Sequence, residues 1–185
     1  MTSETRMLVR KISERYLKTV TEEMGICDKY PVNVSDIIKY LHGNIIEYED
    51  EGSSDGYIKY TNQENPPSFE ICLKKIANEA RRRFTLAHEL GHLILHMDFL
   101  DKEARKGYDE SYYRTIKNYT EKELQADEFA ASFLMPSQEF IRIASENMLN
   151  YGSEYDVVSI ASHFGVSKLA VITRGRFLGL FSWKI

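Results

Sequence analysis

The run His88-Glu89-Leu90-Gly91-His92 contains residue types whose spacing suits metal chemistry. In an α-helix, positions i and i+4 lie roughly 40° apart around the axis and one turn along it, so two imidazoles at these positions can reach one metal ion. Histidine nitrogens bind Zn²⁺ at about 2.0–2.1 Å. Glu89 is adjacent to His88 and can reach a water at the metal without binding the metal itself, which makes it a candidate general base. The spacing therefore predicts a hydrolytic zinc centre.

Two histidines on a buried helix face, hydrogen-bonded within the core, would give the same pattern, and the motif also arises by chance. Its setting favours the metal interpretation. The motif lies in the middle of a helix predicted over 76–97, between the apolar runs 84–87 and 93–95. A second motif with metal-binding side chains follows it. Zinc is the predicted cofactor, although a site with two histidines and a carboxylate also accepts manganese or iron.

A zinc peptidase needs a third protein ligand and an open position for water. His96 continues the same helix face, but it would lie about 12 Å from His88 along the axis, which fits a compact tetrahedron poorly. We therefore expect His96 to support or pack against the site. Glu123 is the better candidate. Asp127, four residues later, faces the same way and would accept the outer N–H of a ligand histidine, fixing its tautomer.

Glu123 has an alternative interpretation. Thr120-x-x-Glu123 matches a capping box, in which the glutamate bonds a backbone N–H at the start of a helix. The helix is predicted over 121–134, ended by Pro136. Its small residues, Ala126, Ala130 and Ala131, would let it pack closely on the motif helix. The ligand interpretation is favoured because the two histidines need a third partner.

Hydrophobic periodicity predicts a mostly helical chain with one small sheet. Runs of β-branched and aromatic residues predict strands at 45–48, 57–60 and 69–73, all before the motif helix. We interpret them as an antiparallel sheet, with the first turn within 51–56 and with 69–73 as a candidate edge for an added substrate strand. The other predicted helices cover 4–20, 35–41 with Ser35 as N-cap, 137–149, 156–164 and 167–174. The pattern indicates an α+β fold.

Composition indicates one soluble domain. The chain has 185 residues and a net charge of −4, which disfavours broad attraction to nucleic acid. Its two cysteines, Cys27 and Cys72, form no metal or redox pair. The charged N-terminus lacks a secretion signal, and no apolar run reaches the roughly 20 residues of a membrane span. We expect a cytoplasmic protein with a single domain over 1–185, a core at about 30–150 and helices of 151–185 packed on it.

Two stretches resemble the ImmA/IrrE family of metallopeptidases: RFTLAHELGHLILH at 83–96 and ELQADEFAASFLMP at 123–136. The sheet before the motif, the segment 161–167 and Arg174 also resemble the family's layout. The resemblance implies a zincin-like fold and a gluzincin-like site, with His88, His92 and Glu123 as ligands and Glu89 as base. It further implies cleavage of a cytoplasmic helix-turn-helix repressor, often encoded by a phage or mobile element.

Several points stay open. Residues 156–174 have a helix-turn-helix character, although the acidic net charge favours helices that pack on the core over a DNA-binding regulator. A zinc-containing regulatory or sensor protein that binds without cleaving is the other alternative; an intact Glu89 favours the enzyme. A lid is hypothesised at 98–119. The oxyanion donor is not chosen among Tyr108, Tyr112, Tyr113, Tyr119 and His163.

Overall fold

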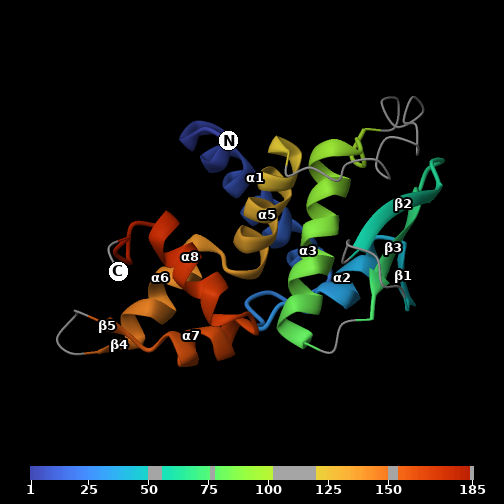
Figure 1. Ribbon diagram of the computed structural model, residues 1–185. Helices are drawn as coiled ribbons and strands as arrows, with labels where there is room; N and C mark the ends of the chain where they lie inside the picture. The colour runs from blue at the N-terminus through green and yellow to red at the C-terminus, as the bar shows by residue number, and fades with distance from the viewer. Residues whose placement is uncertain (50–55, 76–77, 102–119, 150–153, 184–185) are drawn as a thin grey trace.

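The computed structural model describes residues 1–49, 56–75, 78–101, 120–149 and 154–183. The described residues form seven helices, one three-stranded sheet and one two-stranded ribbon (Figure 1). The helices are α1 (Ser3–Glu23), α2 (Val34–Tyr40), α3 (Glu79–His96), α5 (Glu121–Leu134), α6 (Ser137–Glu146), α7 (Val157–Phe164) and α8 (Lys168–Phe177). The predicted α+β fold, mostly helical with a sheet before the motif helix, is confirmed.

The larger sheet consists of β1 (Gly43–Tyr48), β2 (Gly56–Asn62) and β3 (Ser68–Lys74), in the order β1-β3-β2. All three strands were predicted, but the pairing was not. β2 is antiparallel to β3, whereas β1 is parallel to it, so the sheet is mixed instead of antiparallel. The predicted first turn falls largely at 50–55, outside the described residues.

The structure also corrects the predicted edge strand, because β3 is the central strand. Its consecutive buried residues Ile71, Cys72 and Leu73 show that both of its faces are covered. A near-continuous apolar run is typical of a strand buried on both sides. The outer strands expose polar positions such as Asn44 in β1 and Asn62 in β2. Within the described sheet, the edges are therefore β1 and β2.

Close packing under the sheet depends on a glycine. A Cβ at Gly43 would lie 2.4 Å from the ring of Phe69 and 2.8 Å from Ile38. The ring of Phe69 is fully buried and meets Phe99 edge-on at 5.6 Å. His42, which lies between the C-cap of α2 and Gly43, has a φ of 64°. At the other end of this helix the predicted cap was wrong: the N-cap is Asn33, not Ser35, and its side-chain oxygen accepts the backbone N–H of Asp36.

Helix α3 lies between the sheet and helix α5, and α1 packs on the far side of α5 (Figure 1). Buried Leu86, Leu90 and Leu93 fill the interior around α3. The hydroxyl of Ser13 in α1 donates to the carbonyl of Phe129 at 2.8 Å, which ties α1 to α5. The motif helix is thus held by the core on both sides.

The C-terminal helices pack on the rest of the described chain. Arg174 of α8 is 2% exposed and donates to Glu128 of α5, Glu14 of α1 and the carbonyl of Met135. Arg83 of α3 donates to the carbonyl of Gly165, which ends α7 in the left-handed conformation. Buried contacts thus anchor both helices of the segment 156–174 to the rest of the described fold.

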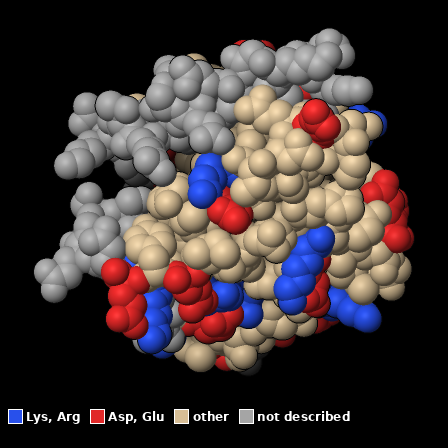
Figure 2. Space-filling view, turned by 90° about the vertical axis from the view of Figure 1, so that its right-hand side faces the viewer, with Lys and Arg blue, Asp and Glu red and all other residues tan. Residues whose placement is uncertain are grey.

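Several surface charges on the sheet side form ion pairs. Figure 2 shows acidic and basic side chains next to one another on this face. Ion pairs of the sheet and its neighbours include Lys59–Glu70, Lys75–Glu49 and Arg82–Glu47, each at 3.0 Å. Of the basic run 81–83, Arg82 thus pairs with an acid and Arg83 bonds a backbone carbonyl. Among the described residues, none of the helices has the length and apolar character needed to cross a membrane.

Candidate metal centre

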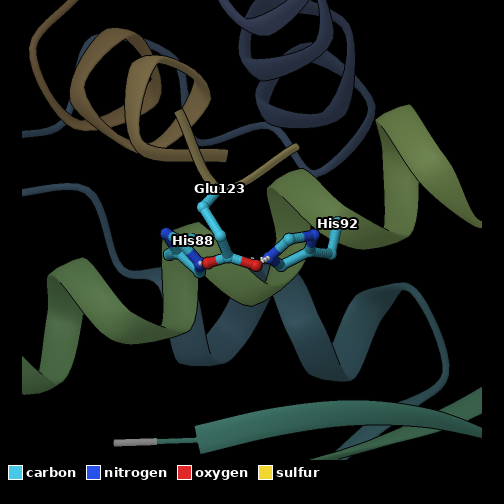
Figure 3. Close-up of side chains that lie close together, drawn as sticks. All are labelled: His88, His92 and Glu123. Carbon is cyan, nitrogen blue, oxygen red and sulfur yellow. Dashed lines mark hydrogen bonds and ion pairs between the residues drawn. The ribbon is translucent and has the colours of Figure 1, made fainter. Parts of the chain in front are cut away.

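Helix α3 presents His88 and His92 on one face, and helix α5 brings Glu123 to them. Figure 3 shows the Glu123 side chain reaching from α5 to both imidazoles. Its Oε2 lies 3.1 Å from Nε2 of His88, and its Oε1 lies 3.3 Å from Nε2 of His92. The two Nε2 atoms are 3.1 Å apart. The structure therefore brings the three predicted ligands together.

These side chains lie close enough together to hold one zinc ion. Ligand atoms at about 2.0–2.1 Å from a central ion are about 3.3–3.4 Å from one another. Nε2 of His88 lies 3.1 Å from Nε2 of His92 and 3.1 Å from Oε2 of Glu123, while the other carboxylate oxygen, Oε1, lies 3.3 Å from Nε2 of His92. Two nitrogens and one carboxylate oxygen also form the donor set of catalytic zinc sites with two histidines and a glutamate. The residues present thus fit a zinc ion in both spacing and chemistry.

The close approach of the two helices depends on small residues. A Cβ at Gly91 would lie 3.1 Å from Phe129 Cβ and 3.2 Å from the Cα of Ala126. Fully buried Ala126 and Ala130 line the facing side of α5. Larger residues would separate the helices and move Glu123 away from the imidazoles.

Both interpretations of Thr120 and Glu123 describe part of the structure. Thr120 is the N-cap of α5, and its hydroxyl accepts the backbone N–H of Glu123 at 3.5 Å. The second bond of a capping box would join the Glu123 carboxylate to the backbone N–H of Thr120. The carboxylate points to the two histidines instead. The capping signal marks where α5 begins, which is what places the carboxylate over the motif.

Asp127 lies where it was predicted to lie. Its Oδ1 is 2.9 Å from Nδ1 of His88. A carboxylate accepts, so Nδ1 of His88 donates, and a neutral ring keeps the Nε2 lone pair for a metal. His96 lies beside the other histidine, with its Nδ1 3.1 Å from Nδ1 of His92 and its Nε2 2.9 Å from Oε1 of Gln125. The contact with Gln125 was not predicted, and no sequence signal indicated it.

The electrostatics of the cluster indicate a site suited to a cation. Burial lowers the pKa of His88, but hydrogen bonds to Asp127 and Glu123 outweigh it and raise the pKa to about 10. Hydrogen bonds from His88 and His92 hold the pKa of Glu123 well below its usual range. Burial lowers the pKa of His96 to about 4, so this ring is neutral at pH 7. Without a metal, a proton on His88 supplies the positive charge.

Glu89 is 6% exposed and lies on the sheet side of α3. Burial raises its pKa, and the neighbouring histidines only partly oppose the shift. Its Oε1 lies 3.5 Å from the position that a Cβ of Gly56 would occupy, at the start of β2. The edge strand β2 therefore passes directly beside the predicted base, a neighbour that sequence reasoning missed.

Other predicted features lie elsewhere. Nε2 of His163 is 2.9 Å from Glu139 of α6, away from the ligand-bearing helices. The four candidate tyrosines and most of the predicted lid fall at 102–119, outside the described residues. A groove of about 630 Å³ between α3, α5 and α8 includes Asp127 in its lining but none of the three ligand residues. The groove is therefore separate from the three ligand side chains.

Comparison with known proteins agrees with this geometry. Residues 42–174 match the family model Peptidase_M78, described as the IrrE N-terminal-like domain. The chain belongs to this family of metallopeptidases. The matched region of the IrrE-like chain extends from the sheet through the metal cluster to Arg174, so it includes α7 and most of α8. The resemblance drawn from the motifs is confirmed.

A solved structure shares the fold of this IrrE-like chain. It is a Mycobacterium tuberculosis transcriptional regulator, with a TM-score of 0.54 and 16% sequence identity. The similarity covers 93% of this chain and 51% of the regulator, so the chain spans about half of that protein's length. At this identity the likeness shows the fold alone. No curated protein matches the chain in sequence.

Proposed function

We propose that this IrrE-like protein is a zinc-dependent endopeptidase that cleaves one specific protein, a helix-turn-helix transcriptional repressor of the cytoplasm. The observation that carries the proposal is the meeting of His88, His92 and Glu123 with spacings that fit zinc, next to a buried Glu89. The repressor as substrate rests on the family resemblance.

A zinc ion held by His88, His92 and Glu123 would polarise the peptide carbonyl and acidify a water beside it. Glu89 takes the proton from the attacking water and passes it to the leaving amine. Burial raises the pKa of this carboxyl above its usual value, which makes it a stronger base for the first step. Asp127 holds His88 in the orientation that the site needs.

The edge strand β2 offers a place for the substrate backbone. Peptides often bind by adding a strand to an exposed sheet edge, where main-chain hydrogen bonds fix their register. Because β2 begins beside Glu89, a peptide paired with β2 would bring its carbonyls to the base. This replaces the earlier candidate edge in β3.

The internal contacts of α7 and α8 support a protein substrate over a nucleic-acid partner. Val171 and Arg174 are buried in the fold, so α8 cannot present these residues to a DNA groove. The ion pairs around the sheet neutralise one another. Phosphate binding would require unpaired cations along one face.

The test combines metal content with cleavage. Purified wild-type protein is expected to hold about one zinc per chain and to cut a co-expressed helix-turn-helix repressor at one site, read by mass spectrometry of the fragments. Glu89→Gln should keep zinc and stop cleavage. Glu123→Ala should weaken zinc binding. Continued cleavage by Glu89→Gln would refute the assignment of the base, and zinc binding without cleavage of any repressor would favour a regulatory role.

A further inference from the structure

A chain of three side chains connects helix α5 to the second histidine ligand. Oε1 of Gln125 lies 2.9 Å from Nε2 of His96, and Nδ1 of His96 lies 3.1 Å from Nδ1 of His92. Nε2 of His92 is the atom that faces Glu123. His92 is 4% exposed, so water has little access to its ring.

With a metal at Nε2 of His92 in place of the proton shared with Glu123, and with Oε1 of Gln125 facing His96, one arrangement of protons satisfies this chain. A carbonyl oxygen can only accept, so Nε2 of His96 must donate to Gln125. With one proton on each imidazole, Nδ1 of His96 is then an acceptor and Nδ1 of His92 must donate to it. Nε2 of His92 is left with a lone pair directed at the metal position. The opposite arrangement would put a proton on that nitrogen and prevent it from binding a metal.

We propose that Gln125 and His96 are positioning residues that fix the metal-binding tautomer of His92. The proposal rests on the metal centre proposed above. Asp127 orients His88 by a direct hydrogen bond to its Nδ1. In the same way the imidazole of His96, itself oriented by the amide of Gln125, would orient His92 through its Nδ1.

The third ligand and the residues that orient the two histidines come from one short stretch of α5. Glu123, Gln125 and Asp127 all belong to the first two turns of α5. The third ligand and the groups that orient the other two therefore reach α3 together. Docking of one helix both completes the ligand set and selects the tautomers of the histidines.

The experiment removes the acceptor and then restores it. Gln125→Leu keeps a side chain of similar size without an acceptor, and Gln125→Glu keeps an acceptor at the same place. Glu121→Gln, at an exposed position of the same helix, is the control. Zinc affinity is measured by competition with a chromogenic chelator, and ring ¹⁵N NMR of the zinc-loaded protein identifies the protonated nitrogen of each histidine.

Loss of an outer hydrogen-bond partner typically weakens metal binding about 10–100-fold. We expect this loss for Gln125→Leu, with Gln125→Glu binding zinc at least as tightly as the wild type and the control unchanged. The wild-type spectrum should show protons on Nδ1 of His92 and on Nε2 of His96. The wild-type spectrum needs no variant, so a variant that fails to fold does not weaken the test.

Three results would overturn the proposal. A wild-type proton on Nδ1 of His96 would reverse the direction of the chain. Unchanged zinc affinity and an unchanged His92 tautomer in Gln125→Leu would make the contact a packing contact only. Either result leaves the metal centre standing. Absence of zinc binding by the wild type would instead remove the metal centre, and the relay with it.

Discussion

Substitution of Gly91 tests whether helix packing controls the metal centre. This glycine lies between the two histidines of the motif, on the side of α3 that faces α5. A Cβ there would approach Phe129 Cβ at 3.1 Å and the Cα of Ala126 at 3.2 Å. Ala126 is one helical turn after Glu123. Because one of the crowded atoms belongs to the α5 backbone, the helix must shift to admit a methyl group.

Two effects of Gly91→Ala oppose each other. Alanine stabilises a helix interior by about 0.8–1.0 kcal/mol relative to glycine. Overpacking of a tight interface destabilises by about 1–3 kcal/mol. We expect a net loss of about 1 kcal/mol in the free energy of unfolding. A helix displaced by a few tenths of an ångström exceeds the roughly ±0.2 Å tolerance of metal–ligand distances. Zinc affinity should therefore fall about tenfold, or about 1.4 kcal/mol.

Urea unfolding of the metal-free protein and zinc competition titration measure the two quantities. Ile143→Val is the control, since it removes a buried methyl group in α6, away from the contact between α3 and α5. It should destabilise by about 0.5–1.5 kcal/mol and leave zinc affinity unchanged. If Gly91→Ala instead gains the full stability expected from helix propensity and binds zinc normally, the contact is not tight and the reasoning fails.

Two further predictions concern protons and buried charge. His88 holds a proton below its metal-free pKa of about 10, and zinc must displace this proton. Zinc binding at pH 7 should therefore release about one proton, and zinc affinity should rise about tenfold per pH unit up to near pH 10. Calorimetry in buffers of different ionisation enthalpy counts the released protons, and a count of zero would contradict the prediction. Arg174→Met should destabilise the protein by about 3 kcal/mol in urea unfolding, because it removes the buried partner that joins Glu128 to the half-buried Glu14. The control Arg142→Met breaks an exposed pair with Glu139 and should cost about 1 kcal/mol or less; equal losses would contradict the role of burial.

The sequence predicted most helices and strands because their signals are local. Periodicity placed α5 at its observed bounds and located all three strands of the sheet. Strand order is a different matter, since it depends on contacts between distant segments. The assumption that consecutive strands are neighbours gave an antiparallel sheet, whereas β1 crosses to the far side of β3. The apolar run Ile71-Cys72-Leu73 was a sequence signal that β3 is central, and the structure shows all three residues buried.

The metal cluster was predictable for a related reason. The helical spacing of His88 and His92 is a local property, and the need for a third ligand limited the search to few carboxylates. Gln125 could not be found this way. It lies two positions from both Glu123 and Asp127, so helix periodicity alone places it off their face. Its contact with His96 depends on the depth at which α5 packs, which no local pattern encodes.

Helix α5 connects the stability of this protein to its chemistry. Glu123 and Asp127 face α3, while the next residue, Glu128, is 3% exposed and bonds Arg6, Arg10 and Arg174. These partners come from α1 and α8, at opposite ends of the chain. The ion pairs that anchor α5 in the core therefore also determine where its ligand-bearing face lies. Because metal ligands tolerate only small displacements, a change at α1 or α8 that shifts α5 is expected to reach the metal centre without touching it.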